Sequence, residues 1–167
     1  MKIVTQGLTR VVFIYGDYAI KIPWINFVIL IKCFSKYKNT NKLNERINRY
    51  GKNKILAIFR YIFYILSSNR REYLYFKEHK DEESLLPVIK IFLFGYIIVQ
   101  PKGDVFNHSN PRWIKFLKKI IKRGVNDIDF LKPENFCEFN GVIKLLDYGN
   151  NQTQKILNLR GFEIIKE

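Results

Sequence analysis

The chain has 167 residues, of which 47% are hydrophobic and 16% aromatic, enough apolar surface for one domain or for two small lobes around a shared cleft. Lys and Arg outnumber Asp and Glu by 29 to 15, and the net charge of +14 favours anionic partners such as nucleotides, nucleic acid or acidic membrane surfaces. Cys33 and Cys137 lie in no CxxC or Cys/His pattern, which argues against a zinc site and against a disulfide framework. Residues 1–20 lack the layout of a signal peptide, and the apolar runs 24–31 and 55–66 are too short to span a bilayer, so we expect a cytoplasmic protein.

The N-terminal part predicts a β-hairpin. Leu8–Tyr15 is rich in β-branched and aromatic residues, Gly16-Asp17 is a turn signal, and Tyr18–Ile22 alternates apolar and polar residues. Pro23 closes the hairpin, and Lys21 lies near the end of its second strand. Taken alone, this lysine is most simply an ordinary exposed residue of a strand.

Residues 26–66 differ from the rest of the chain in charge. They hold nine Lys or Arg residues against a single acid, Glu45, and so carry more than half of the net charge. Two apolar, helical runs flank a polar centre, and we expect an insertion whose middle is mobile or ordered by a partner. Cations interleaved with aromatic residues fit three interpretations: phosphate binding and base stacking on a nucleic acid, contact with an anionic membrane, or a helical pair packed on its own domain with a solvated charged face.

A helix is expected over Arg70–His79. Asn69 and Glu72 have the spacing of a capping box, in which each side chain bonds the backbone N–H of the other residue. Leu85–Lys90 and Ile91–Val99 then read as two strands, the second bent around its glycine.

A connector at 100–103 leads to a second helix, which begins at Asn110-Pro111 and runs to Arg123 before a glycine. The apolar periodicity predicts a buried stripe on this helix, and the opposite face is basic. The stripe consists of Ile114, Leu117, Ile120 and Ile121.

A hairpin is predicted between Asn135 and Asp147, with its turn at Asn140-Gly141. Such a hairpin brings an amide and a carboxylate to the same end of its two strands. Residues 152–167 are expected to form a last short element.

The order of these elements, together with three motifs, resembles the protein-kinase-like superfamily. YAIKI (18–22) is similar to the VAIK strand of that family, and Glu72 lies where the family has the glutamate of its helix C. DFLKPENF (129–136) resembles the catalytic loop HRDLKPENI, and IKLLDYG (143–149) resembles the metal-binding segment VKLIDFG. The resemblance covers about residues 5–150.

The resemblance implies an α+β protein with a minimal bilobal protein-kinase-like fold. Residues 1–100 would form an N-lobe on a small antiparallel sheet, with the basic and apolar insertion at 26–66. Residues 101–167 would form a reduced, truncated helical C-lobe that carries the catalytic and metal-binding loops. Compact kinase-like proteins of bacteria and viruses have this size, which implies a cytoplasmic location, in the host cytoplasm if the protein is viral.

The activity that the resemblance implies is ATP·Mg²⁺-dependent phosphoryl transfer. Asn135 and Asp147 would hold Mg²⁺, a hard cation that prefers carboxylate and amide oxygens. Lys21 would contact the α- and β-phosphates while an ion pair with Glu72 holds it in place. The acceptor stays open between a Ser or Thr of a protein and a small molecule such as a sugar.

Three further roles follow from the resemblance. Asp129 would orient or deprotonate the acceptor hydroxyl, and Lys132 would offset charge on the transferring group. The glycine-rich phosphate loop of the family is reduced to 6–9, where Gly7 is the one glycine. The family has its catalytic Asp five residues before the Asn of LKPEN, whereas here Asp129 lies six residues before it and Asp127 eight, so either one is a candidate base.

Two other functions fit the same residues. The extra residue in the catalytic loop and the lack of a large helical C-lobe favour a catalytically impaired pseudokinase that acts as a binding or regulatory module. The basic surfaces at 26–66 and 112–123 favour a nucleic-acid-binding protein, whose affinity would weaken steeply with salt. Singly, the site residues also have structural explanations: Glu72 as a capping partner, Asn135 as the start of a turn and Asp147 as part of a common Asp-x-Gly loop.

Overall fold

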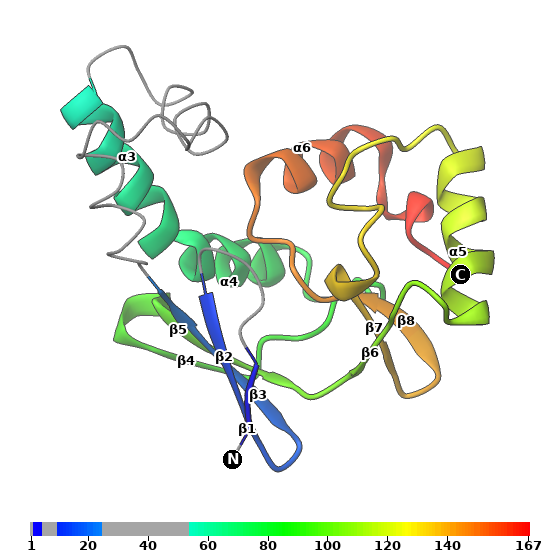
Figure 1. Cartoon of the computed structure of the whole chain (residues 1–167), viewed down its shortest axis with the longest axis horizontal. Helices are drawn as coiled ribbons and strands as arrows, with labels where there is room; N and C mark the ends of the chain where they lie inside the picture. Colours follow the sequence, from blue (N-terminus) through cyan, green and yellow to red (C-terminus); the bar gives the residue numbers. More distant parts are fainter. Residues whose placement is uncertain (1, 5–9, 25–53) are drawn as a thin grey trace.

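The computed structural model of the chain describes residues 2–4, 10–24 and 54–167, which form a mixed α+β structure. The elements gather around two antiparallel sheets, one of five strands and one of three, and the chain passes from the first to the second after residue 101 (Figure 1). The predicted phosphate loop with Gly7 and the polar centre of the predicted insertion lie outside the described residues.

The larger sheet has the strand order β1-β2-β3-β5-β4, with every neighbouring pair antiparallel. Its strands are β1 (Lys2–Val4), β2 (Arg10–Tyr15), β3 (Tyr18–Pro23), β4 (Lys90–Phe92) and β5 (Ile97–Pro101). The hairpin β2–β3 is confirmed, and its turn uses Gly16 with a φ of 54°. Because Tyr15 pairs with Tyr18, Val12 lies opposite Lys21.

The two strands predicted over Leu85–Lys90 and Ile91–Val99 are wrong in their boundaries. The strands β4 and β5 are separated by a short 3-10 turn, η1 (Leu93–Gly95), and β5 continues through residues 100 and 101, which the sequence assigned to a connector. The backbone has a φ of 91° at Gly95, so this glycine reverses the chain instead of bending a single strand.

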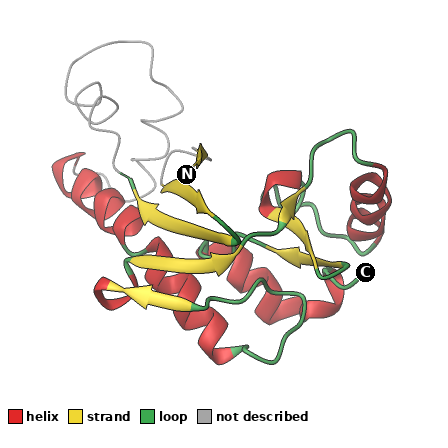
Figure 2. Cartoon of the chain, turned by 90° about the horizontal axis from the view of Figure 1, so that it is seen from below, coloured by secondary structure: helices red, strands yellow, loops and turns green. Residues whose placement is uncertain are grey.

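Two helices precede β4, namely α3 (Lys54–Leu66) and α4 (Ser68–Glu78). Helix α4 packs on β3 and β5 and covers one face of the larger sheet (Figure 2). The predicted capping box is wrong, because the N-cap is Ser67 and its side chain makes no capping hydrogen bond. Asn69 is buried within the helix and donates from Nδ2 to the carbonyls of Lys21 at 2.8 Å and Tyr96 at 2.7 Å. This residue therefore fastens α4 to the sheet and does not cap it.

The smaller sheet has the order β6-β7-β8, formed by β6 (Asp104–Val105), β7 (Phe136–Phe139) and β8 (Val142–Leu145). The predicted hairpin is confirmed, with its turn at Asn140 and Gly141, whose φ values of 52° and 77° suit these two residue types. A 3-10 turn, η2 (Pro133–Asn135), leads into β7. The backbone N–H of Leu86 donates to the carbonyl of Leu145 at 3.0 Å, so the segment before β4 begins against this sheet. Its end joins the larger sheet, because the N–H of Ile89 donates to the carbonyl of Val99 in β5 at 2.8 Å.

Helix α5 (Pro111–Lys122) agrees with the predicted helix to within one residue. Asn110 caps it by accepting hydrogen bonds from two backbone N–H groups of the first turn. The predicted buried stripe is partly wrong: Trp113, Phe116 and Ile120 are buried, whereas Ile114 and Ile121 are exposed. Two large aromatic side chains bury more apolar area than two isoleucines, and this turns the helix by one position.

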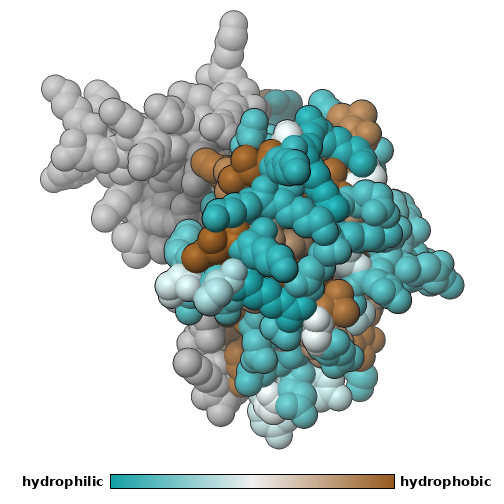
Figure 3. Space-filling view, turned by 90° about the vertical axis from the view of Figure 1, so that its right-hand side faces the viewer, coloured by the Kyte–Doolittle hydropathy of each residue, from teal (hydrophilic) through white to brown (hydrophobic). Residues whose placement is uncertain are grey.

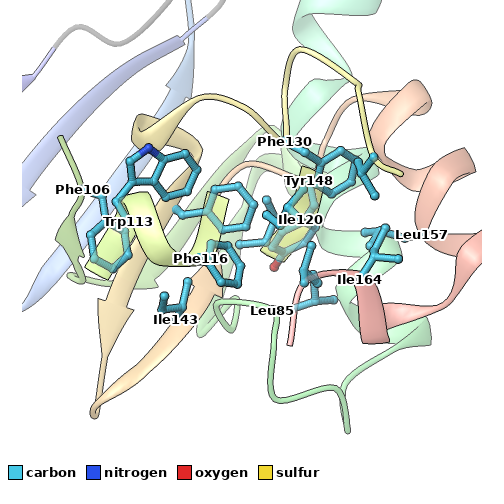
Figure 4. Packing of buried hydrophobic residues seen from close by; sticks show 14 of the residues in the cluster. Leu85, Phe106, Trp113, Phe116, Ile120, Phe130, Ile143, Tyr148, Leu157 and Ile164 are labelled. Carbon is cyan, nitrogen blue, oxygen red and sulfur yellow. The ribbon is translucent and has the colours of Figure 1, made fainter. Parts of the chain in front are cut away.

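The main hydrophobic core lies around the smaller sheet, where α5 meets the last elements, α6 (Asn151–Arg160) and η3 (Phe162–Ile164). Figure 4 shows Trp113 and Phe116 packed together with Ile120 and Tyr148 nearby. The predicted last element is thus a helix followed by a 3-10 turn. Among the described residues, no helix is both long and apolar enough to cross a bilayer.

Candidate functional site

A cleft of about 1600 Å³ opens beside the larger sheet. One wall is a face of β2 and β3, formed by Arg10, Val12, Ile14, Ala19 and Lys21. The other walls come from the connection at 101–105 and from the loops between 124 and 135 and between 146 and 152. Five of the predicted site residues line this cleft, namely Lys21, Asp129, Lys132, Asn135 and Asp147.

Lys21 is held by two contacts at the base of the cleft. Its Nζ donates to Glu72 Oε1 at 2.7 Å and to the carbonyl of Leu146 at 2.7 Å. Glu72 has a relative exposure of 0% and Lys21 is also buried, so each charge depends on the other for compensation. The structure therefore brings together the two residues predicted to pair, and joins both to the residue before Asp147.

Arg10 is a member of the site that the sequence analysis missed. Its Nη1 pairs with Glu72 Oε2, and its Nη2 pairs with Asp147 Oδ1 at 3.0 Å. Glu72 thus lies between two buried cations, Arg10 and Lys21, and Arg10 bridges it to Asp147. Two cations and two carboxylates compensate each other, and they connect β2, β3, α4 and the segment after β8.

The hairpin register contained a signal for Arg10. The turn at Gly16-Asp17 places Val12 opposite Lys21, and residues two apart on a strand share a face. Arg10 therefore lies on the same face as Lys21, two residues before Val12 on strand β2. A cation on an apolar face of a strand is unusual, and it points to a buried acidic partner.

Gly149 is required by the close approach of this cluster. A Cβ atom at this position would lie 2.5 Å from Arg10 Nη2 and 2.7 Å from the carbonyl oxygen of Ser68. The glycine of the DYG motif therefore has a steric role, because only a residue without a side chain lets the backbone pass between Arg10 and α4.

Asp147 is ionised and still accessible. Burial by itself would raise the pKa of this carboxyl, but the charges of Arg10 and Lys21 and a hydrogen bond from the backbone N–H of Gly149 outweigh it, so its pKa lies below the usual range. Its side chain keeps 43% of its surface exposed. The carboxylate is thus held negative at neutral pH, with room for a further ligand.

The lowered pKa of Asp147 gives a testable pH dependence. A carboxyl whose pKa is lower in the folded than in the unfolded state adds stability above the unfolded pKa of about 3.9, and this stability is lost as the pH falls through the folded pKa. We expect Asp147→Asn to lower the free energy of unfolding by no more than about 1 kcal/mol at pH 7, since the group is half exposed. Urea titrations should show this difference shrinking below about pH 4, whereas a difference that persists in acid would contradict the assignment.

Asp129 lines the cleft and lies in the loop that leads into η2. Its Oδ1 accepts a hydrogen bond from Lys132 Nζ at 2.8 Å, and its Oδ2 accepts one from Asn150 Nδ2. Its backbone carbonyl accepts a hydrogen bond from Asn135 Nδ2 at 2.8 Å. The Asp129 carboxylate is therefore oriented by a cation and an amide, and Lys132 is its partner.

Asp127, the other candidate base, shapes the same loop. Its Oδ1 accepts a hydrogen bond from the backbone N–H of Asp129 at 2.9 Å, and its Oδ2 accepts one from Gln152 Nε2 at 2.6 Å. The first contact closes a local turn of the kind that an Asp commonly makes two residues ahead of a backbone N–H. Both oxygens of Asp127 are thus used in folding the loop and in tying it to α6.

The residues present fit a magnesium ion bound together with phosphate. The amide nitrogen of Asn135 is engaged, whereas its Oδ1 has no hydrogen bond to any described residue. Asp147 also lines the cleft and is half exposed, and the residue before it, Leu146, donates its backbone N–H to the carbonyl of Asn135 at 2.7 Å. No group of three or more His, Cys, Asp or Glu side chains that could hold a metal by themselves occurs within 2–4, 10–24 and 54–167. Two oxygen donors suit Mg²⁺, which usually takes its remaining ligands from water and phosphates.

Cys137 does not belong to this chemistry. It is buried in β7, and burial raises the pKa of its thiol to about 12, so it stays protonated at neutral pH.

Comparisons of the chain with protein-family models, with curated proteins and with solved structures each found no match.

Proposed function

We propose that the protein is an ATP·Mg²⁺-dependent phosphotransferase with a minimal, two-lobed kinase-like fold. The observation that carries this proposal is that Lys21, Asp129, Asn135 and Asp147 line the same cleft, with Glu72 paired to the lysine behind it. These residues come from four separate segments of the chain, namely β3, α4, the loop 124–135 and the segment after β8, and each has the chemistry that phosphoryl transfer requires.

The nucleotide would lie on the sheet side of the cleft. Val12, Ile14 and Ala19 give this wall an apolar surface, against which a planar base can pack. Lys21 Nζ would bind the α- and β-phosphates, and its contacts with Glu72 and Leu146 fix its position beforehand. Asn135 Oδ1 and the Asp147 carboxylate would hold Mg²⁺, which when bound supplies charge neutralisation on the phosphates.

The acceptor hydroxyl would approach Asp129. In the proposed step, the acceptor oxygen forms a bond to the γ-phosphorus, the bond from that phosphorus to the β–γ bridging oxygen breaks, and ADP leaves. The Asp129 carboxylate takes the hydroxyl proton, and Lys132, at 2.8 Å from that carboxylate, compensates negative charge on the group in transfer. The acceptor is either a Ser or Thr of a protein or a small molecule such as a sugar.

A catalytically impaired pseudokinase is the second candidate, and a specific observation favours it. Both carboxylate oxygens of Asp129 are already engaged, one by Lys132 and one by Asn150. An acceptor hydroxyl would have to displace or share one of these contacts. If neither contact can be broken, the protein would bind nucleotide without transferring its phosphoryl group.

A thermal-shift titration with ATP, in the presence of Mg²⁺ and separately of EDTA, tests the proposal. Ligand at about 100 times its dissociation constant stabilises the folded state by about 2.7 kcal/mol, which corresponds to a rise in Tm of about 5–10 °C for a chain of this size. We expect this rise for the parent with Mg²⁺ and a clearly smaller one with EDTA. We expect Asp147→Ala to lose the difference between the two conditions, because it lacks a metal ligand.

The result separates the candidates. No shift with ATP under either condition would rule out both the phosphotransferase and a nucleotide-binding pseudokinase. A shift without any production of ADP, with Mg²⁺ or with Mn²⁺, would favour the pseudokinase.

A further inference from the structure

The connection between β4 and β5 exposes a continuous apolar tip, formed by residues 91–94 (Ile-Phe-Leu-Phe). Leu93 and Phe94 are 65% and 88% exposed, and Ile91 and Phe92 are also exposed. Strand β4 is an edge of the larger sheet, so the tip projects from the end of the molecule and not from a groove (Figure 1). The candidate site does not use these residues.

The tip is held in a conformation that its sequence disfavours. The backbone N–H of Tyr96 donates to the carbonyl of Leu93 at 3.1 Å, and the two central residues have positive φ, 58° at Phe94 and 91° at Gly95. This is the geometry of a type I′ turn, in which Asn is the favoured first central residue. Leu93 also has a positive φ, of 49°. A bulky apolar residue in this region costs stability, and here it gains no burial in return.

Two exposed cations lie next to the tip. Lys90 directly precedes it and is exposed, and exposed Arg70 of α4 lies at its base, where its Cα would be 3.3 Å from a Cβ on Gly95. Helix α3, whose Phe59 and Phe63 are exposed, lies at the same end of the molecule, to the left in both views (Figure 1, Figure 2). The face over the opposite end is mainly hydrophilic (Figure 3).

We propose that the tip 91–94 inserts into the interface of an anionic membrane. A convex group of apolar and aromatic side chains can enter the boundary between headgroups and acyl chains, while Lys90 and Arg70 remain at the level of the anionic headgroups. The net charge of +14 directs the whole chain toward such a surface.

Two other occupants fit the geometry less well. A second copy of the chain could add a strand to β4, but this edge has only three residues and carries exposed Lys90, features that oppose strand addition. A protein partner would need to supply a deep apolar pocket for a tip that stands free, and no charged pattern besides cations marks the tip for a particular one.

The variant Phe94→Asn tests the proposal without risk to the fold. Asn-Gly is the preferred pair for a type I′ turn, so we expect Tm to rise by about 2–4 °C. In flotation with vesicles of phosphatidylcholine and phosphatidylserine, we expect binding to fall about tenfold, since the most exposed apolar side chain of the tip is lost. The control Leu159→Gln removes a residue that is 74% exposed on α6, at the other end of the molecule, and should leave vesicle binding unchanged.

The outcomes are distinct. Parent protein that does not float with the mixed vesicles, or Phe94→Asn that floats as well as the parent, would overturn the proposal. Equal loss in Leu159→Gln would do so too, because it would indicate nonspecific adsorption. If light scattering instead shows a parent dimer that Phe94→Asn converts to a monomer, the tip binds a second copy. Nucleotide binding, measured separately by thermal shift, is expected to be the same in parent and Phe94→Asn, so the proposed function stands or falls independently.

Discussion

Replacing Glu72 by Gln is expected to lower the free energy of unfolding by about 3–5 kcal/mol. Glu72 has no exposed surface and accepts from Lys21 on one oxygen and from Arg10 on the other. The amide has nearly the same shape but no charge, so two buried cations would lose their shared counter-charge. Removal of one member of a buried ion pair is costly because the remaining charge stays desolvated. Here Lys21 loses its carboxylate partner, and Arg10 keeps only the half-exposed Asp147.

Urea unfolding at pH 7 measures this effect, and Glu78→Gln is the matched control. Glu78 lies on the same helix, α4, and is exposed, so the same substitution should change stability by less than about 0.5 kcal/mol. A loss below about 1 kcal/mol in Glu72→Gln would mean that the Asp147 carboxylate alone compensates Arg10 and Lys21.

Features with a local cause could be predicted from the sequence. The hairpins β2–β3 and β7–β8 were predicted because Gly16-Asp17 and Asn140-Gly141 are turn signals whose preferred backbone conformations fix the pairing of the strands beside them. Helix α5 was predicted from its start at Asn110-Pro111, its apolar periodicity and the glycine that follows it, and the structure shows that Asn110 caps its first turn. In each case the residues that determine the structure lie within a few positions of each other.

Features that depend on distant partners were missed or misinterpreted. Asn69 and Glu72 have the spacing of a capping box, yet their side chains bond residues 48 and 51 positions away in β3. Arg10 was not recognised because its partners, Glu72 and Asp147, are 62 and 137 positions away. A buried charge cluster of this kind outweighs a local cap, since its members have no other way to be compensated.

The prediction of the β4–β5 connection was wrong for another reason. A type I′ turn is normally signalled by Asn-Gly or Asp-Gly, whereas here the central pair is Phe94-Gly95. The apolar run therefore looked like a continuous strand. Among the described residues, no burial compensates this departure from local preference, and such departures are typical of residues that are kept for function.

For the candidate site, the motifs named residues that lie together, but they did not indicate the charges around them. Lys21, Asp129, Lys132, Asn135 and Asp147 were all named from motifs, and all line one cleft. Arg10 changes the expected balance of charge there, because Asp147 already has a cationic partner at 3.0 Å. A magnesium ion would have to share the Asp147 carboxylate with the Arg10 guanidinium or displace that guanidinium.

Replacing Asp129 by Asn is expected to lower the rate of ATP turnover by about 10²–10⁴-fold, the usual contribution of a general base. The amide oxygen can still accept from Lys132, and only the contact with Asn150 is lost, but the amide cannot take a proton. The loop should keep its shape because the backbone N–H and carbonyl of Asp129 remain bonded to Asp127 and Asn135. The thermal shift with ATP and Mg²⁺ should therefore change by less than the uncertainty of the measurement. Steady-state production of ADP, with water as the acceptor, gives the rate.

Asp127→Asn is the comparison that assigns the base. Its Oδ1 would still accept from the backbone N–H of Asp129, so we expect turnover within about fivefold of the parent if Asp129 is the base. A large loss in Asp127→Asn combined with a small one in Asp129→Asn would reverse the assignment. A parent that binds ATP but is no faster than Asp129→Asn would show that the contacts of Asp129 with Lys132 and Asn150 keep its carboxylate from reacting, and the impaired form of the site would then be the correct one.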